Sequence, residues 1–253
     1  MDEPPYYMRW LRDNPLREEI SQGFEYSDCW VDDARLVVIN ALDAFEKGAR
    51  VLTRTAVASA RRDNGVWLAT LRNSETGETS TVRARCIVNA AGPWVSDVIL
   101  NVAGSNSSRN VRLVKGSHIV VPKFWQGQQA YLVQNDDKRV IFINPYEGDK
   151  ALIGTTDIAY EGRAEDVQAE EFEIEYLIKA VNRYFKAKLR RSDVLTSFSG
   201  VRPLFDDGKG NPSAVTRDYV FDLDMTDNVP LLNVFGGKIT TFRELAERAM
   251  HKL

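Results

Sequence analysis

Hydrophobic and polar positions follow two periods along the first hundred residues. Apolar residues at helical spacing begin after Asp32 or Asp33, either of which can cap a helix, and the pattern stops at Gly48. The next residues, 50–57, alternate with period two, which predicts a strand with one β-branched face formed by Val51, Thr53, Thr55 and Val57. A helix followed directly by a strand is half of an α/β unit.

The next segments predict a β-meander and a buried strand. Residues 66–71 and 79–83 flank a polar turn and favour a hairpin or meander. The nearly continuous apolar run 84–92 ends in small residues, which is typical of a central parallel strand covered on both faces. Pro93 suits the first turn of a helix that follows.

From about residue 111 the pattern changes to short strands at close intervals. It predicts an antiparallel sheet from strands at 111–121, 130–135, 139–144 and 151–155. A long helix is expected over 169–187, where apolar residues return at helical spacing. Its acids, Glu170, Glu171, Glu173 and Glu175, are interpreted as a solvated face. Strands at 195–201, 214–221 and 231–235 and a helix from Thr241 complete the prediction, with a boundary near residue 110.

Composition limits the function classes. The chain has 253 residues, with 43% hydrophobic and 27% charged, which is ordinary for a soluble globular protein. A formal net charge of -3 argues against a nucleic-acid binder and makes any anion site local. Cys29, Cys86, His118 and His251 have no metal-ligand spacing, so we expect no metal site. The free cysteines favour the cytosol, and no apolar run approaches the roughly 18 residues of a membrane span.

The end of the chain carries the most informative local pattern. A buried strand over 231–235 runs into Gly236 and Gly237, then Lys238, and Thr241 with Glu244 has the spacing of a capping box. Glycine amides and a lysine beside a helix start could bind an electron-rich ligand. A tight turn with a solvated lysine is an equal alternative. The spacing does not match a Walker loop.

Three further residues are candidates for chemistry, each with a structural alternative. Arg202 and Arg217 stand near strand ends and could clamp a phosphate or carboxylate, or they could pair with a nearby acid such as Asp206 or Asp218. His118, on a strand, could be a general base or a satisfied core histidine.

Two further sequence patterns give weaker indications of function. Gly154-Thr155-Thr156-Asp157 could line a pocket but fits a turn better. No G-x-G-x-x-G occurs, because Gly208-Lys209-Gly210 is followed by serine at position 213. By motif alone, the chain has no dinucleotide fingerprint.

Six blocks resemble the bacterial aerobic FAD-dependent sn-glycerol-3-phosphate dehydrogenases, a branch of the D-amino-acid-oxidase-like flavoproteins. The likeness runs from about Gly23 to Leu253 and rests on Gly23–Leu36, Lys115–Pro122, Gly154–Asp157, Ser199–Leu204, Thr216–Tyr219 and Phe235–Thr241. It implies an α/β and α+β fold. Residues 1–110 would form part of a Rossmann-like FAD-binding domain with a β-meander, 111–230 a mixed or antiparallel substrate domain, and 231–253 a strand and helix returning to the first domain.

The resemblance also implies site residues. FAD would be held by Ala56 and Val57 at the adenine, by Ala90, Ala91, Gly92 and Trp94 at the diphosphate or ribityl region, and by Gly236, Gly237, Lys238, Ile239 and Thr240 at the isoalloxazine. The substrate would be bound by Arg202, Arg217 and Thr156. His118, Arg202 and Lys238 would serve catalysis, with a base taking a proton while hydride leaves C2 for flavin N5.

The implied reaction is oxidation of sn-glycerol 3-phosphate to dihydroxyacetone phosphate, with electrons passed to a quinone. The implied location is the cytoplasmic face of the inner membrane, as a peripheral protein, and a homodimer is left open. Alternatives are another D-amino-acid-oxidase-like oxidoreductase, or an inactive fragment. The family's G-x-G-x-x-G unit and C-terminal helical region have no counterpart here, so we expect weak or no FAD binding and an uncovered apolar surface.

Overall fold

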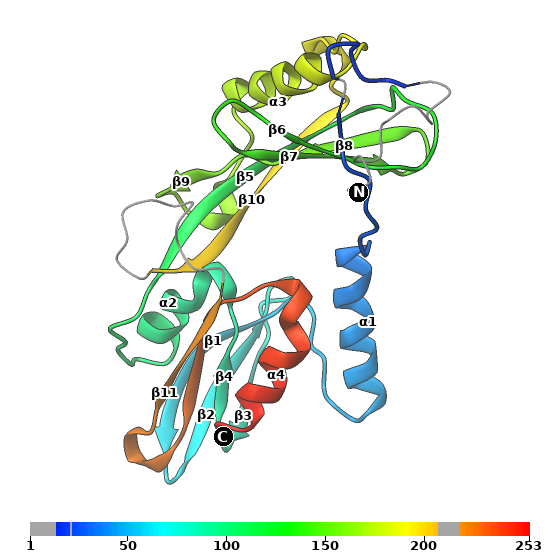
Figure 1. Cartoon of the computed structure of the whole chain (residues 1–253). Coiled ribbons are helices and arrows are strands. Elements are labelled where there is room, and N and C mark those ends of the chain that lie inside the picture. Colours follow the sequence, from blue (N-terminus) through cyan, green and yellow to red (C-terminus); the bar gives the residue numbers. More distant parts are fainter. Residues whose placement is uncertain (1–13, 21, 207–217) are drawn as a thin grey trace, which may run out of the picture. The chain divides into compact units, whose positions relative to one another are not determined.

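The computed structural model describes residues 14–20, 22–206 and 218–253, and the chain divides into two compact units. Unit 1 contains residues up to Asp28 together with Val114–Val201. Unit 2 contains Cys29–Leu113 and the residues from Arg202 onward. Helices and strands carry the labels of Figure 1.

Unit 1 is built on the antiparallel sheet that the sequence predicts. The strand order is β10-β5-β8-β7-β6, and a further strand, β9, pairs with β5. Register is set by pairs such as His118 with Gly154 and Ile143 with Ile153. The strands are β5 (Val111–Pro122), β6 (Tyr131–Gln134), β7 (Val140–Tyr146), β8 (Lys150–Gly154), β9 (Ile158–Tyr160) and β10 (Thr196–Phe205).

Helix α3 (Glu171–Tyr184) packs on this sheet and confirms the predicted long helix (Figure 1). It is shorter than 169–187 because Phe185 leaves the helix and is buried in the core. The core is made by β-branched and aliphatic side chains from both layers: Ile119, Val121, Ile141, Ile143, Ile153, Ile174, Leu177 and Val181. Each such side chain contributes about 1.5–3 kcal/mol on burial. Two short 3-10 turns, η3 (Ala164–Asp166) and η4 (Arg191–Asp193), flank α3.

The prediction of a solvated glutamate face on α3 is wrong at one position. Glu173 is fully buried, and its carboxylate accepts hydrogen bonds instead of facing water. Its position beside the buried Lys115 explains the difference, since a buried cation needs a counter-charge.

Unit 2 contains two three-stranded sheets. The first is the predicted antiparallel meander of β1 (Thr55–Asp63), β2 (Val66–Asn73) and β3 (Thr79–Ala84). The second has the order β11-β12-β4, from β11 (Tyr219–Asp224), β12 (Leu231–Gly236) and β4 (Ile87–Asn89). β11 pairs antiparallel with β12, although the predicted domain boundaries put it in the substrate domain. A 3-10 turn, η6 (Thr226–Asn228), lies between the two strands.

The predicted strand over 50–57 is wrong in its first half. Arg54 has a positive φ of 54°, and its carbonyl accepts the Ser74 backbone N–H at 2.8 Å, so the chain turns there. β1 begins at Thr55 and pairs antiparallel with β2. The expected α/β half-unit is therefore replaced by a helix leading into a meander.

The prediction of a central strand covered on both faces over 84–92 is also wrong. β4 has three residues, pairs parallel with β12 and is an edge strand within the described part of the chain. Gly92, three residues after the end of the strand, adopts a positive φ of 56°, and helical turns begin there. These confirm the predicted helix near Pro93 as η1 (Gly92–Trp94), α2 (Val95–Asp97) and η2 (Val98–Val102).

Helix α1 (Asp33–Glu46) is confirmed and begins where Asp32 Oδ1 accepts the Arg35 N–H at 2.9 Å. None of its residues is buried, and Val37, Val38 and Phe45 are 60%, 65% and 62% exposed. Apolar side chains are thus exposed along this helix. No helix in residues 14–20, 22–206 and 218–253 is long and apolar enough to cross a bilayer.

The last helix, α4 (Phe242–Met250), follows the 3-10 turn η7 (Ile239–Thr241), but the predicted capping box is wrong. The Thr241 hydroxyl donates to the Lys238 carbonyl at 3.3 Å and makes no capping hydrogen bond to α4. Glu244 instead pairs with Arg248 one turn later, at 2.6 Å. The 3-10 turn places the Thr241 side chain on the preceding carbonyl.

Candidate functional site

Two of the three predicted cofactor-binding segments meet at one edge of a sheet in unit 2. β4 and β12 are parallel, with Ile87 opposite Leu231 and Asn89 opposite Asn233. The carboxyl ends of parallel strands lie at the same edge, where ligands of open α/β sheets bind. Residues 90–94 leave β4 at this edge, and residues 236–240 leave β12 there.

A buried asparagine pair, which the sequence reasoning did not single out, holds these two strand ends. Asn89 Nδ2 donates to the Asn233 Oδ1 and to the Val95 carbonyl, both at 2.9 Å. Asn89 Oδ1 accepts the Ala91 N–H at 3.3 Å. Both asparagines are 1–3% exposed. Asparagine within two otherwise apolar strands is the signal that could have revealed them, because a buried amide needs partners.

The glycines at this edge have backbone conformations that suit a close approach. Gly92, Gly236 and Gly237 have φ of 56°, 75° and 109°, which L side chains rarely adopt. At Gly236, a Cβ would lie 2.7 Å from the Asp218 carbonyl oxygen, so this position must be glycine for β11 to pair with β12. At Gly92, a Cβ would meet Pro203 at an ordinary 3.8 Å.

Of the other predicted cofactor-binding residues, Ala91 is half-buried and the rest are exposed. Lys238, Ile239 and Thr240 are exposed, and Trp94 is 43% exposed. Ala56 and Val57 also are exposed, but they lie on β1 in the other sheet of unit 2. Their contact with adenine stays a prediction.

His118 lies on β5 in unit 1 and has a specific ring environment. Its imidazole stacks on Phe198, with centroids 5.2 Å apart and planes 10° from parallel. It faces Gly154 across the strand pair, and a Cβ at Gly154 would lie 2.0 Å from His118 Cδ2. Glycine at 154 therefore makes the space that the imidazole occupies. The ring is half-buried, so a catalytic and a structural role both remain open.

Thr156 is buried in a polar cluster of unit 1. Its hydroxyl donates to Glu173 Oε1 at 2.7 Å and accepts the Ser117 N–H at 2.9 Å. Lys115 Nζ lies 2.5 Å from Glu170 Oε1 and 2.9 Å from Glu173 Oε2. The predicted contact of Thr156 with substrate stays a prediction, since its hydroxyl already takes part in this cluster.

The cluster shifts two pKa values. Burial alone would lower the pKa of Lys115, but hydrogen bonds from its ammonium to Glu170 and Glu173 outweigh burial and raise that pKa. Burial alone would raise the pKa of Glu173, but the Glu170 N–H, Lys115, Ser117 and Thr156 donate to its carboxylate and lower that pKa. Both groups are therefore charged at neutral pH.

Arg202 and Lys238 belong to unit 2, whereas His118 and Thr156 belong to unit 1. Arg202 is a half-buried residue of β10. Asp206, one of its suggested partners, accepts a hydrogen bond from Arg112 at 3.1 Å. Arg217 lies outside the described residues.

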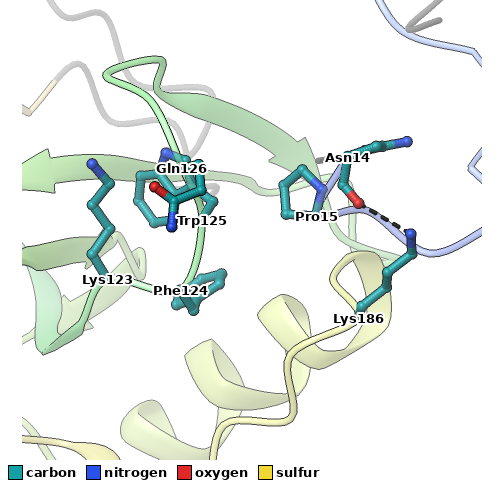
Figure 2. A pocket seen from close by; sticks show the side chains of 7 residues that line it. All are labelled: Asn14, Pro15, Lys123, Phe124, Trp125, Gln126 and Lys186. Atoms are coloured by element: carbon teal, nitrogen blue, oxygen red, sulfur yellow. Dashed lines mark hydrogen bonds between the residues drawn. The ribbon is translucent and has the colours of Figure 1, made fainter. Parts of the chain in front are cut away.

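A pocket of about 440 Å³ occurs elsewhere in unit 1 (Figure 2). Its lining residues are Asn14, Pro15, Lys123, Phe124, Trp125, Gln126 and Lys186. Lys186 Nζ donates to the Asn14 carbonyl at 3.1 Å and Lys123 Nζ to the Gly127 carbonyl at 2.5 Å, so backbone carbonyls engage both ammonium groups. None of the predicted site residues lines it.

Comparison with known families identifies the class of protein to which this fold belongs. The chain belongs to the FAD dependent oxidoreductase family (DAO), which matches residues 6–229. FAD is the cofactor of this family.

Particular relatives narrow the resemblance. Over 239 residues the chain is 80% identical to D-erythritol 1-phosphate dehydrogenase of Brucella abortus, covering 94% of this chain and 48% of the relative. It is 49% identical to aerobic glycerol-3-phosphate dehydrogenase of Escherichia coli, covering 97% and 49%. The glycerol-3-phosphate dehydrogenase of Bacillus halodurans, solved with FAD, matches with TM-score 0.80 and 31% identity, covering 94% and 46%. The chain thus spans about half the length of these relatives.

Proposed function

We propose that this chain takes part in the FAD-dependent oxidation of a polyol phosphate at a secondary hydroxyl. The observation that carries the proposal is the shared edge of β4 and β12, which brings together residues 90–94 and 236–240. Support comes from the FAD dependent oxidoreductase family and from relatives named for two polyol phosphates.

The residues at this edge fit FAD. Positive-φ glycines at 92, 236 and 237 leave backbone amides open to approach by phosphate or by an electron-rich ring. The exposed ammonium of Lys238 suits negative charge, and the exposed indole of Trp94 offers an aromatic face. When bound, FAD supplies the two-electron acceptor for a hydride from the substrate carbon.

The chain's own residues then have separate roles. His118 takes the hydroxyl proton as the general base. Arg202, with Arg217, holds the phosphate dianion. Lys238 stabilises the negative charge that develops as the substrate is oxidised. We further propose a quinone as the final acceptor, peripheral attachment at the cytoplasmic face of the inner membrane, and a homodimer as the assembly to test.

Two substrates follow from the relatives. sn-Glycerol 3-phosphate would yield dihydroxyacetone phosphate, and the relatives at 49–50% identity carry that specificity in their names. D-Erythritol 1-phosphate is favoured by the relative at 80% identity. Both offer a phosphate and a secondary hydroxyl, so they share the roles assigned above.

A flavin absorbance band and a dye-linked assay test the proposal. Purified protein, with and without added FAD, is assayed on both substrates in parallel. Turnover of either supports the proposal, and the ratio of the two kcat/KM values chooses between them. Bound flavin with no turnover of either favours another amine or amino-acid oxidase chemistry. A chain that retains no flavin and has no activity refutes the function for this chain.

Two glycines provide a matched control for the cofactor contact. Gly92 and Gly104 have nearly the same φ, 56° and 58°, and neither Cβ would clash. Alanine at either position costs about 1 kcal/mol or more of backbone strain. We expect only Gly92→Ala to weaken FAD binding. Equal FAD affinity in both variants would contradict the assignment of Gly92.

The arginine assignment has its own test. Arg202→Ala combined with Arg217→Ala should raise KM for the phosphorylated substrate by about 10-fold or more, since charge-assisted hydrogen bonds are lost. Arg61→Ala, an exposed change on β1, is the control. If the double variant binds the substrate as the parent does, the arginines do not hold the phosphate.

A further inference from the structure

Three segments of unit 1 surround the His118 imidazole. His118 comes from β5, Gly154 from the end of β8, and Phe198 from β10. Gly154 leaves the space that the imidazole fills, and Phe198 stacks on it. The position of the imidazole therefore depends on how these three segments are held together.

The same three segments are tied together by hydroxyl groups next to these residues. Ser117 precedes His118, Thr156 follows Gly154 by two residues, and Ser199 follows Phe198. Successive residues of a strand point to opposite faces, so Ser117 and Ser199 lie on the faces of β5 and β10 opposite His118 and Phe198. The imidazole is held from one face of the sheet and the hydroxyls gather on the other.

Glu173 of α3 is the common acceptor of this group. Its Oε1 accepts the hydroxyls of Ser117 and Thr156, each at 2.7 Å. Since Ser117 gives its only hydroxyl proton to a carboxylate, Ser199 is the donor in the 2.6 Å contact between the two serine hydroxyls. One carboxylate thus connects β5, the segment after β8 and β10.

We propose that Glu173 is a positioning residue that fixes His118 through Ser117, Thr156 and Ser199. The catalytic meaning of this proposal rests on the function proposed above, whereas the effect on the imidazole does not.

The negative charge of Glu173 is required because four donors converge on it. Lys115 Nζ lies at 2.9 Å and the Glu170 N–H at 3.0 Å from Oε2, in addition to the two hydroxyls on Oε1. A carboxylate offers about four lone-pair sites and no hydrogen. Glutamine at 173 would point an NH2 group at one pair of these donors, so part of the set must move apart.

Glu170 offers a matched control on the same lysine. Its carboxylate also contacts Lys115, at 2.5 Å, but its side chain is 61% exposed. Glu170→Gln removes a charge beside Lys115 and leaves the three hydroxyl contacts of the Glu173 group in place. A change seen with Glu173→Gln and not with Glu170→Gln therefore reports the hydroxyl group and not the lysine.

The test uses the chain's two histidines. NMR of the imidazole C–H groups gives one signal set from His118, shifted by the ring current of Phe198, and one from the exposed His251, an internal reference. We expect Glu173→Gln to move the His118 signals toward those of an exposed histidine and to leave His251 unchanged. Glu170→Gln should leave both sets in place.

A milder variant keeps the test decisive if Glu173→Gln does not fold. Ser199→Ala removes only the hydroxyl contact between Ser199 and Ser117 and should shift His118 in the same direction by less. Parent-like His118 signals in folded Glu173→Gln, or in Ser199→Ala where the first variant does not fold, overturn the proposal.

Turnover is a separate readout. If the parent oxidises a polyol phosphate, Glu173→Gln should lower kcat by about 10- to 100-fold with KM changed much less, as expected for a displaced base. If the parent has no activity, the function proposed above fails while the NMR result still decides the role of Glu173. A His118 shift without loss of kcat would refute the catalytic meaning.

Discussion

Asn89→Ala is the substitution whose cost can best be worked out from the structure. The change removes two 2.9 Å hydrogen bonds and leaves the Val95 carbonyl and Asn233 Oδ1 without that donor. Asn233 is itself buried, so its amide oxygen is cut off from water. Each buried polar group deprived of its partner costs about 1–3 kcal/mol. The third bond, at 3.3 Å, adds little.

We therefore expect Asn89→Ala to lower the free energy of unfolding by about 2–6 kcal/mol. Urea unfolding followed by circular dichroism and tryptophan fluorescence measures this free energy. The slope of the free energy against urea concentration should be the same in the parent and the variant. Because the chain has two compact units, separate transitions are fitted separately if they occur.

Asn101→Ala is the control for this substitution. Asn101 also donates an amide hydrogen bond, to Asp97 Oδ1 at 2.6 Å, but it is exposed. Its loss should stay within about 0.5 kcal/mol. If Asn89→Ala costs no more than Asn101→Ala, the buried pair does not hold the ends of β4 and β12. We expect Asn89→Ala to retain less flavin than Asn101→Ala. Equal flavin content in the two variants would count against the role of the buried pair.

Three further predictions concern unit 1. Gly154→Ala should destabilise the fold by about 1–3 kcal/mol, because the new Cβ would lie 2.0 Å from His118 Cδ2. Gly200→Ala is the control and should be nearly neutral, because a Cβ there would meet nothing within 4 Å. Thermal unfolding of both variants measures the difference. Lys115→Met should lower the free energy of unfolding in urea by about 3–5 kcal/mol, because it leaves Glu173 buried without its cation. A loss no larger than that of an exposed lysine substitution would contradict this. The folded state lowers the pKa of Glu173 below its ordinary 4.5. The stabilisation that the charged carboxylate provides is therefore present above pH 4.5 and is lost as the pH falls through the pKa of the folded state. Glu173→Gln should make the free energy of unfolding less dependent on pH in the acid range.

Much of the fold could be predicted because the pattern reports burial directly. The strands of unit 1 alternate or run apolar between clear turns, and all except the short β9, which was not predicted, were found within a few residues of their actual bounds. α1 has its predicted start because Asp32 has a side chain that can accept the Arg35 N–H. These are local effects, and neighbouring residues are enough to determine them.

The errors arose where pairing across the chain decides the structure. Residues 50–54 have strand-like composition, but the turn at Arg54 is set by its hydrogen bonds to Ser74. Thr241 has the spacing of a cap, but the 3-10 turn before α4 places its hydroxyl on the Lys238 carbonyl. Spacing along one segment does not contain this information.

The glycines of the candidate site could be predicted from the sequence, but the side chains that support them could not. Gly236 and Gly237 were identified because they stand between an apolar strand and a helix start, whereas Gly92 was identified only from the family resemblance. The parallel pairing of β4 with β12 was not available from the pattern, and it is this pairing that puts the glycines at one edge. Asn89 and Asn233 stand out as polar residues in two apolar strands, but only the pairing of β4 with β12 shows that they contact each other.

Glu173 shows that the sequence held more than the acidic pattern of α3 suggested. Glu173 precedes Leu177 by four residues and Ala180 by seven, and both are fully buried, so the helical period puts Glu173 on the face that packs on the sheet. Glu175 instead precedes Lys179 by four, and the two form an exposed pair at 3.5 Å. Lys115, between a buried valine and a buried glycine on β5, requires a counter-charge from whatever covers that strand. The burial of these residues, which the structure supplies, accounts for Glu173 as the partner of Lys115.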